Sequence, residues 1–215
     1  MGADPGATRA AILTAAANAF SQRGFDGVVM EDIGRAADVN KAMIYYHFSS
    51  KAGLYGEILR DMFGAVAMRL AGVTAHAADP TGRIRALVEA IAREAEARPH
   101  FPSIWLREIA DGGSHVDKGT MALIAGILQQ VASAVRKGVA TKRFVAVDPL
   151  LVQLGIVGPL LMFFAGAPIR RKAASQLKDA VPITTDQVIA HVQRVALLTL
   201  EGDARPVGAF QGKHR

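Results

Sequence analysis

The side chains with the clearest capacity for chemistry are crowded into residues 41–51, KAMIYYHFSSK. Lys41 and Tyr45 carry groups that hydrogen-bond to base edges or phosphates, and Ala42 is small enough to let a backbone approach a groove and touch a thymine methyl. Lys51 follows two serines, which places it at the amino end of a helix, where its charge and unpaired backbone N–H groups can hold a phosphate together. These residue types suit contact with duplex DNA.

Two short helices separated by a tight turn are predicted around this segment. Apolar spacing predicts helices over 29–37 and 41–47, and Asp-Val-Asn forms the turn, with Asn40 as the N-cap of the second helix. On that helix Ile44 and Phe48 face inward, which leaves the opposite face exposed. Helix, short turn and helix is the geometry of helix-turn-helix DNA binding, in which the second helix enters the major groove.

At these residues the chain resembles the TetR family of transcriptional regulators. The resemblance rests on AILTAAANAFSQRGFDGV and MEDIGRAADVNKAMIYYHFSSKAGLYGEIL, which cover about the first quarter of the chain. It implies a homodimer that binds a palindromic double-stranded DNA operator, represses transcription and is released by a small-molecule effector. It also implies base contacts from Lys41, Ala42 and Tyr45, and phosphate contacts from Tyr46, His47 and Lys51.

Four positions depart from the family's usual pattern. Val28 and Val29 stand where threonine or serine is usual at the start of the second helix, so a hydroxyl contact to phosphate is missing and only backbone N–H groups remain. Glu31 follows at a position where its charge would repel phosphate, and Gly34 stands where alanine is usual. Of these departures, the Glu31 charge would oppose phosphate binding at the start of this helix.

The whole chain reads as all-α, because it has neither a period-two strand nor an Asn-Gly hairpin signal. We expect a helix-turn-helix domain over 1–50, a helical effector-binding and dimerisation domain over 51–201, and a loose tail over 202–215. Besides the two short helices, the predicted helices span 8–23, 51–73, 82–97, 102–110, 117–137, 148–166 and 182–200. The long helix over 51–73 can bridge the two domains.

An apolar effector pocket is expected within the second domain, although the same side chains could form ordinary core. Apolar and aromatic residues with few polar partners suit a small hydrophobic or amphipathic ligand. The candidate pocket residues are Phe101, Trp105, Glu108, Met121, Gln153, Met162 and Phe163.

Dimerisation is expected because helix 148–166 is apolar on every side and helix 182–200 is apolar on two. Two such helices from each of two chains would make a four-helix interface. The overlapping run 149–169 is also long enough to span a bilayer, which leaves a membrane-anchored regulator as an alternative. Pro159 and two glycines interrupt that run, so a buried helix and no membrane partner are the favoured interpretation.

The distribution of charged residues and the absence of cysteine restrict the possible partners and reactions of the chain. The chain has 25 Lys and Arg against 19 Asp and Glu, yet residues 1–51 are neutral. The excess lies later, at Arg136, Lys137, Lys142, Arg143, Arg170, Arg171, Lys172 and Lys178. No cysteine is present, which excludes thiol nucleophiles and cysteine-ligated metals and indicates a reducing, cytoplasmic location.

Catalysis lacks a recognisable site in the sequence. There is no G-x-S-x-G, H-E-x-x-H or G-x-G-x-x-G motif, and Ser114 and His115 are adjacent without an evident third member of a triad. His47 has no partner at helical spacing that would make a metal site. We therefore expect no enzyme, metal or cofactor, and a helical enzyme with an unrecognised site stays as the weaker alternative.

Overall fold

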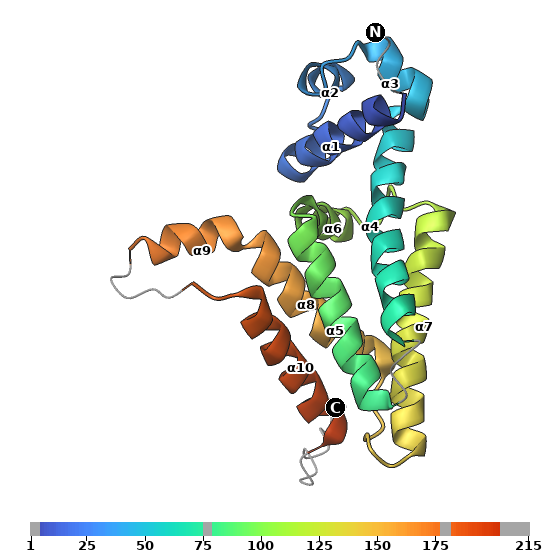
Figure 1. Cartoon of the computed structure of the whole chain (residues 1–215), viewed down its shortest axis with the longest axis vertical. Coiled ribbons are helices and arrows are strands. Elements are labelled where there is room, and N and C mark those ends of the chain that lie inside the picture. The colour runs from blue at the N-terminus through green and yellow to red at the C-terminus, as the bar shows by residue number, and fades with distance from the viewer. Residues whose placement is uncertain (1–4, 75–78, 177–181, 203–215) are drawn as a thin grey trace, which may run out of the picture.

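The computed structural model describes residues 5–74, 79–176 and 182–202. These residues form ten α-helices and no strand (Figure 1), so the all-α prediction is confirmed. The helices are α1 (Pro5–Arg23), α2 (Met30–Ala36), α3 (Lys41–Phe48), α4 (Lys51–Thr74), α5 (Pro80–Ala97), α6 (His100–Ala110), α7 (Lys118–Ala140), α8 (Pro149–Ala165), α9 (Ala167–Ala174) and α10 (Thr185–Glu201). The expected tail, 202–215, lies outside the described residues except for Gly202.

Local sequence sets the ends of the first three helices. Gly24, with a φ of +73°, takes the left-handed conformation that ends α1. The turn before α3 packs so closely on α2 that a Cβ at Gly34 would lie 2.8 Å from the Val39 carbonyl oxygen, which explains glycine there. Asn40 caps α3 as predicted, because its Oδ1 accepts from Met43 N at 2.8 Å.

The two serines after α3 have separate roles. Ser49, with a φ of +61°, ends α3 and its N–H bonds to the Tyr45 carbonyl oxygen. Ser50 begins the next helix, since its Oγ accepts from Gly53 N at 2.9 Å. Lys51 therefore stands at the first position of α4, as expected.

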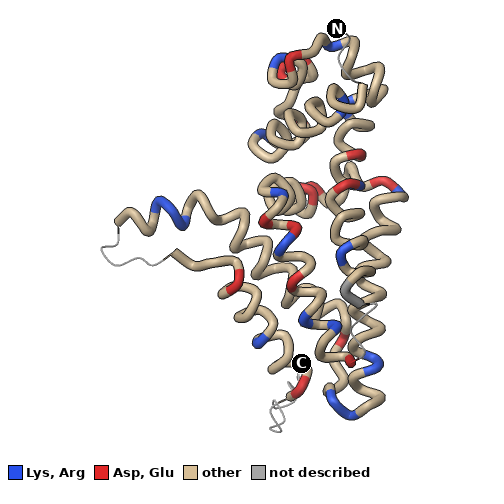
Figure 2. Tube along the Cα trace, in the orientation of Figure 1, with Lys and Arg blue, Asp and Glu red and all other residues tan. Residues whose placement is uncertain are grey.

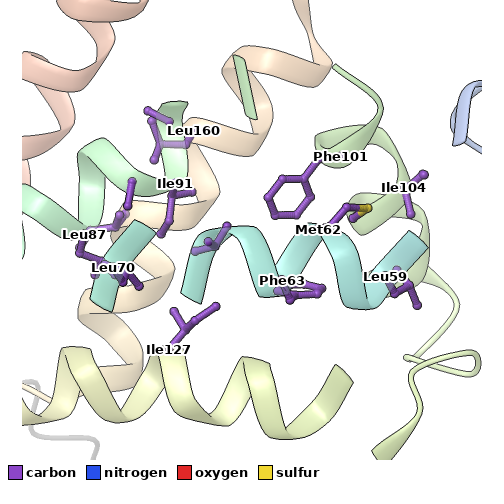
Figure 3. Close-up of a cluster of buried hydrophobic side chains, with 14 of the residues drawn as sticks. Leu59, Met62, Phe63, Leu70, Leu87, Ile91, Phe101, Ile104, Ile127 and Leu160 are labelled. Carbon is purple, nitrogen blue, oxygen red and sulfur yellow. The ribbon is translucent and has the colours of Figure 1, made fainter. Parts of the chain in front are cut away.

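Helix α4 is the central element of the molecule. It starts below α3 and beside one end of α1, and runs down between α5 and α7 (Figure 1), packing on α1, α5 and α7. Figure 3 shows its buried side chains meeting those of α5, α6, α7 and α8. The labelled members of this core are Leu59, Met62, Phe63, Leu70, Leu87, Ile91, Phe101, Ile104, Ile127 and Leu160. A displacement of α4 within this core would therefore also move its amino end, which directly follows α3.

Helix α9 was not predicted, since the apolar run was read as one segment. The chain bends by 57° between α8 and α9, at Gly166, and α9 projects from the body of the molecule (Figure 1) with none of its residues buried. Within the described ranges no single helix is long and apolar enough to cross a membrane; only the bent α8–α9 pair passes that test of length and composition.

Helices α8 and α10 pack on each other but leave many apolar side chains exposed. Helix α8 buries Ile156 and Leu160 completely, while Leu151 on its other side is 63% exposed. On α10, Leu200 is buried and Leu198 is 65% exposed. The other large apolar side chains exposed on the two helices are Leu150, Leu154, Met162 and Val195.

The basic excess lies far from the first three helices. Figure 2 shows Lys and Arg on α9 and at the end of the molecule opposite α1–α3, where Lys142 and Arg143 follow α7. Lys178, predicted to belong to the same excess, lies outside the described residues. The net charge of the chain is therefore no guide to the charge near α3.

Candidate DNA-binding surface and effector cavity

Helix α3 has one buried face and one exposed face, as its periodicity predicts. Ile44 is fully buried and Phe48 is 7% exposed. On the opposite side Tyr45 is 40% and Tyr46 80% exposed, and Lys41 is also exposed. Neither tyrosine belongs to the core, so the exposed face of α3 is open to a partner.

An ion pair changes the expected role of Glu31. Its Oε1 lies 2.6 Å from Lys41 Nζ, and the hydrogen bond lowers the pKa of Glu31 and raises the pKa of Lys41. The Lys41 ammonium also lies 5.7 Å from the centroid of the Tyr45 ring. The basic side chain at the start of α3 is thus already neutralised within the protein.

The residues expected at phosphates lie around α3 and the start of α4. His47 is half-buried between the rings of Tyr46 and Phe48, with centroid distances of 5.2 and 6.0 Å. Lys51 is half-buried, and its Nζ lies 4.4 Å from the centroid of the Phe25 ring. This cation–π contact fixes the Lys51 ammonium at the amino end of α4.

The two valines before α2 differ in their surroundings. Val28 is 1% exposed and packs into the core, whereas Val29 is 53% exposed at the N-cap position. The Val29 side chain makes no capping hydrogen bond. The missing hydroxyl therefore concerns Val29, and it leaves the amino end of α2 without a side-chain cap.

An apolar cavity of about 50 Å³ lies between α4, α5, α6, α7 and α8. Three of the predicted pocket residues, Phe101, Trp105 and Gln153, line it. The sequence-based interpretation missed the other lining residues, which are Phe63, Val66, Ile91, Ile124, Ile127, Val157 and Leu161. Phe63 and Val66 belong to the periodic apolar stripe of α4, which was read only as a connecting helix.

The other four predicted pocket residues do not line this cavity. Met121 is 51% and Met162 66% exposed. Phe163 packs against the Phe164 ring and the Arg170 guanidinium instead. On α8 the residues at i, i+4 and i+8 from position 153 face the cavity, so the next residue, Met162, is rotated away by about 100°. This cavity therefore brings together three of the seven predicted pocket residues and leaves the other four elsewhere.

Glu108, the fourth predicted pocket residue that does not line the cavity, is fully buried at a junction between α4, α6 and the loop after α6. The Tyr55 hydroxyl donates to its Oε2 at 3.0 Å, and His115 N donates to its Oε1 at 2.7 Å. Burial, together with the Glu108 charge, raises the pKa of Tyr55, so its hydroxyl remains a donor at neutral pH. Phe25 packs on both Tyr55 and His115, which connects the first helices to this junction.

Two further contacts join α1 to α6 and α4. Arg107 Nη2 donates to the Gln22 carbonyl oxygen at 3.0 Å. Arg9 pairs with Glu57 at 2.6 Å, and Glu57 also pairs with Arg60, which in turn pairs with Asp117. The hydrogen bonds from Arg60 and then Arg9 hold the pKa of Glu57 below its ordinary value. The position of α1 is thus set by contacts to α4 and α6.

A triad-like cluster occurs at the same junction but lacks the geometry for catalysis. Ser114 Oγ lies 3.1 Å from His115 Nδ1, and Glu108 Oε2 lies 3.3 Å from the same nitrogen. A Ser-His-carboxylate relay needs the serine and the carboxylate on different nitrogens. Among the described residues there is also no group of three side chains able to hold a metal ion.

Comparison with known proteins agrees with this geometry. Residues 12–58 match the family model described as bacterial regulatory proteins, tetR family. Over 111 residues the chain is 35% identical to the HTH-type transcriptional repressor NicS of Pseudomonas putida, and the match covers 52% of each chain. The chain therefore matches about half the length of this relative.

Two solved structures share the fold over most of the chain. The TetR family transcriptional regulator PfmR from Thermus thermophilus has a TM-score of 0.67 and 23% identity, covering 90% of this chain and 99% of its own. The ketosteroid transcriptional regulator KstR2 of Mycobacterium tuberculosis has a TM-score of 0.66 and 21% identity, covering 91% and 95%. A three-helix amino-terminal unit with an exposed third helix, followed by a helical domain, defines the helix-turn-helix class of bacterial regulatory protein. Residues 12–58 thus match the TetR family, and the chain as a whole shares the fold of solved TetR-family regulators.

Proposed function

We propose that this protein is a transcriptional repressor that binds a palindromic DNA operator as a homodimer. The observation that carries the proposal is the exposed face of α3, where side chains able to read base edges surround a small alanine on a helix fixed by a buried opposite face. NicS, which matches about half of this chain, is itself named a transcriptional repressor. A DNA partner implies a cytoplasmic location.

In this proposal Lys41, Ala42 and Tyr45 face bases. Tyr46, His47 and Lys51 face phosphates. Lys41 can reach a base only by leaving Glu31, so binding exchanges one internal ion pair for a contact to DNA. With residues 1–51 neutral overall, we expect a shallow dependence of affinity on salt.

The proposed dimer joins α8 and α10 of two copies into a four-helix interface. Exposed leucines at 151 and 198 lie on these two helices, and covering them with the same surface of a second copy would satisfy two-fold symmetry. Residues 51–201 then form the effector-binding and dimerisation domain, and residues 1–50 the DNA-binding domain. Two-fold symmetry would place the recognition helices about 34 to 36 Å apart, one turn of DNA.

The proposed effector is a small apolar or amphipathic molecule that binds in the cavity and releases the operator. Phe63 and Val66 of α4 line that cavity. Tyr55 on the same helix donates a hydrogen bond to Glu108, at the junction between α4 and α6 below the DNA-binding helices. A movement of α4 would therefore reach both sites. A 100-fold change in operator affinity corresponds to about 2.7 kcal/mol of coupling.

Selection of DNA from a random pool by the full-length protein tests the proposed function. We expect an inverted-repeat sequence, and we expect Tyr45→Ala to weaken binding to it by about 1 to 3 kcal/mol while random DNA is bound as before. Met68→Ala is the control, because Met68 is 72% exposed on α4 and away from α3. Recovery of no preferred sequence, or equal losses on both DNAs, would refute the proposal.

A further inference from the structure

The chemistry of the cavity walls restricts what it can bind. None of the ten lining residues within the described part of the chain is ionisable. A carboxylate or an ammonium group placed there would lose its hydration without gaining an opposite charge, which costs far more than burying a neutral polar group. The walls therefore select against charged ligands.

One polar atom among these walls lacks a partner. Gln153 Oε1 is buried and accepts no hydrogen bond. Gln153 lies on α8 at the first of three helical positions that face the cavity, one turn before Val157. A buried acceptor without a donor costs about 1 to 3 kcal/mol, so a ligand that supplies a donor gains affinity there.

Aromatic side chains form one side of the cavity. The Phe63 ring packs edge-on against Trp105, at a centroid distance of 4.8 Å, and against Phe101 at 5.6 Å. Rings favour further rings in such edge-to-face and offset contacts. A flat hydrocarbon ring would continue this packing.

We propose that the cavity takes an uncharged, ring-containing molecule whose single hydroxyl donates to Gln153. A hydroxyl suits this position because it both donates and accepts, so it can pair with either end of the side-chain amide. The inference rests on the proposed function only in assigning the bound molecule the role of effector.

The cavity must widen to accept such a molecule. Its volume of about 50 Å³ is below the roughly 150 Å³ at which an engineered cavity in another protein binds benzene. Trp105, Ile124 and Val157 are only half-buried, so the wall they form can move outward. Binding of a ring therefore requires displacement among α6, α7 and α8, the helices that carry these residues.

The single tryptophan of the chain gives a direct readout, because Trp105 lines the cavity. Full-length protein is titrated with 4-butylphenol, its methyl ether 4-butylanisole, 4-butylbenzoate and the neutral 4-butylbenzamide while Trp105 fluorescence is followed. We expect the phenol to bind about two- to tenfold more tightly than the ether, the value of one neutral hydrogen bond. We expect the benzoate to bind at least about tenfold more weakly than the benzamide.

Matched variants locate the hydrogen bond. Gln153→Met should bring the phenol and the ether to equal affinity, whereas Gln129→Met, on the exposed side of α7, should leave their ratio unchanged. The inference is overturned if the benzoate binds as tightly as the benzamide, if Gln153→Met keeps the phenol preference, or if none of the four compounds alters Trp105 fluorescence.

Operator binding in the presence of the same compounds distinguishes the proposed ligand class of the cavity from the proposed effector role of the bound molecule. If the phenol binds and leaves operator affinity unchanged, the effector role fails and the ligand class stands. If the benzoate binds and releases the operator, the ligand class fails and the proposed function stands.

Discussion

Replacing Tyr55 by phenylalanine removes one hydroxyl from the junction between α4 and α6. The Tyr55 side chain is 2% exposed and its hydroxyl donates to Glu108 Oε2 at 3.0 Å. The variant keeps the ring, so the edge contacts with Phe20 and Phe25, at 4.9 and 5.2 Å, remain. The change therefore isolates a single buried hydrogen bond.

The expected cost is about 2 kcal/mol of unfolding free energy. Hydrogen bonds to charged groups contribute about 1.5 to 3 kcal/mol, and a buried acceptor that loses its donor keeps its desolvation cost. Glu108 would retain the donor His115 N, at 2.7 Å, which limits the loss. For a chain of this length the melting temperature should fall by about 4 to 8 °C.

Urea unfolding followed by far-ultraviolet circular dichroism measures this cost, with both proteins at one concentration because the proposed dimer would make stability depend on concentration. Tyr46→Phe is the matched control, since the Tyr46 side chain is 80% exposed and its hydroxyl should contribute less than about 0.5 kcal/mol. A Tyr55→Phe variant as stable as wild type would refute the assignment of Glu108 as a partner that needs this donor.

Three other changes test separate parts of the structure. Val29→Thr should add a side-chain cap to α2 and raise the unfolding free energy by about 0.5 to 1 kcal/mol in the same urea assay; an unchanged value would contradict the capping argument. Glu31→Gln should strengthen operator binding by up to about fivefold in a mobility-shift assay, because Lys41 then reaches a base without first leaving an exposed ion pair; an unchanged affinity would mean that Lys41 makes no contact to the operator. Burial, and then the Arg98 charge, lowers the pKa of His100. As the pH falls through about 6.5, His100 therefore binds a proton in the unfolded chain but not in the folded chain. Stability should therefore fall as the pH drops from 7 towards 5, and a His100→Asn variant with the same pH profile would contradict this.

The helices and the exposed face of α3 could be predicted from the sequence, because they depend on local residue patterns. Asn40 marks the start of α3, and the spacing of Ile44 and Phe48 fixes which side is buried. The predicted helices are all present, while α9 was missed because Gly166 bends an apolar run that periodicity alone treats as continuous.

The cavity and the ion pairs could not be predicted from the sequence, because they depend on which helices pack against each other. Phe63 carries the same apolar signal as any core residue of α4, and only the crossing of five helices makes it part of a wall. Tyr55 and Glu108 are 53 positions apart, so no local pattern links them. Glu31 was expected to repel phosphate, whereas the fold gives it Lys41 as a partner.

The bond from Arg107 to the Gln22 carbonyl oxygen has a consequence for how such a protein can change over generations. Any residue at position 22 presents the same carbonyl, so this contact survives substitution of the side chain there. A gene that exchanged its first fifty codons, while keeping Arg9 to pair with Glu57 and aromatic residues at positions 20 and 25 to pack on Tyr55, would encode a chain in which residues 1–50 dock on the rest as before. In evolutionary terms, the operator and the effector proposed for this protein would then be free to diverge independently.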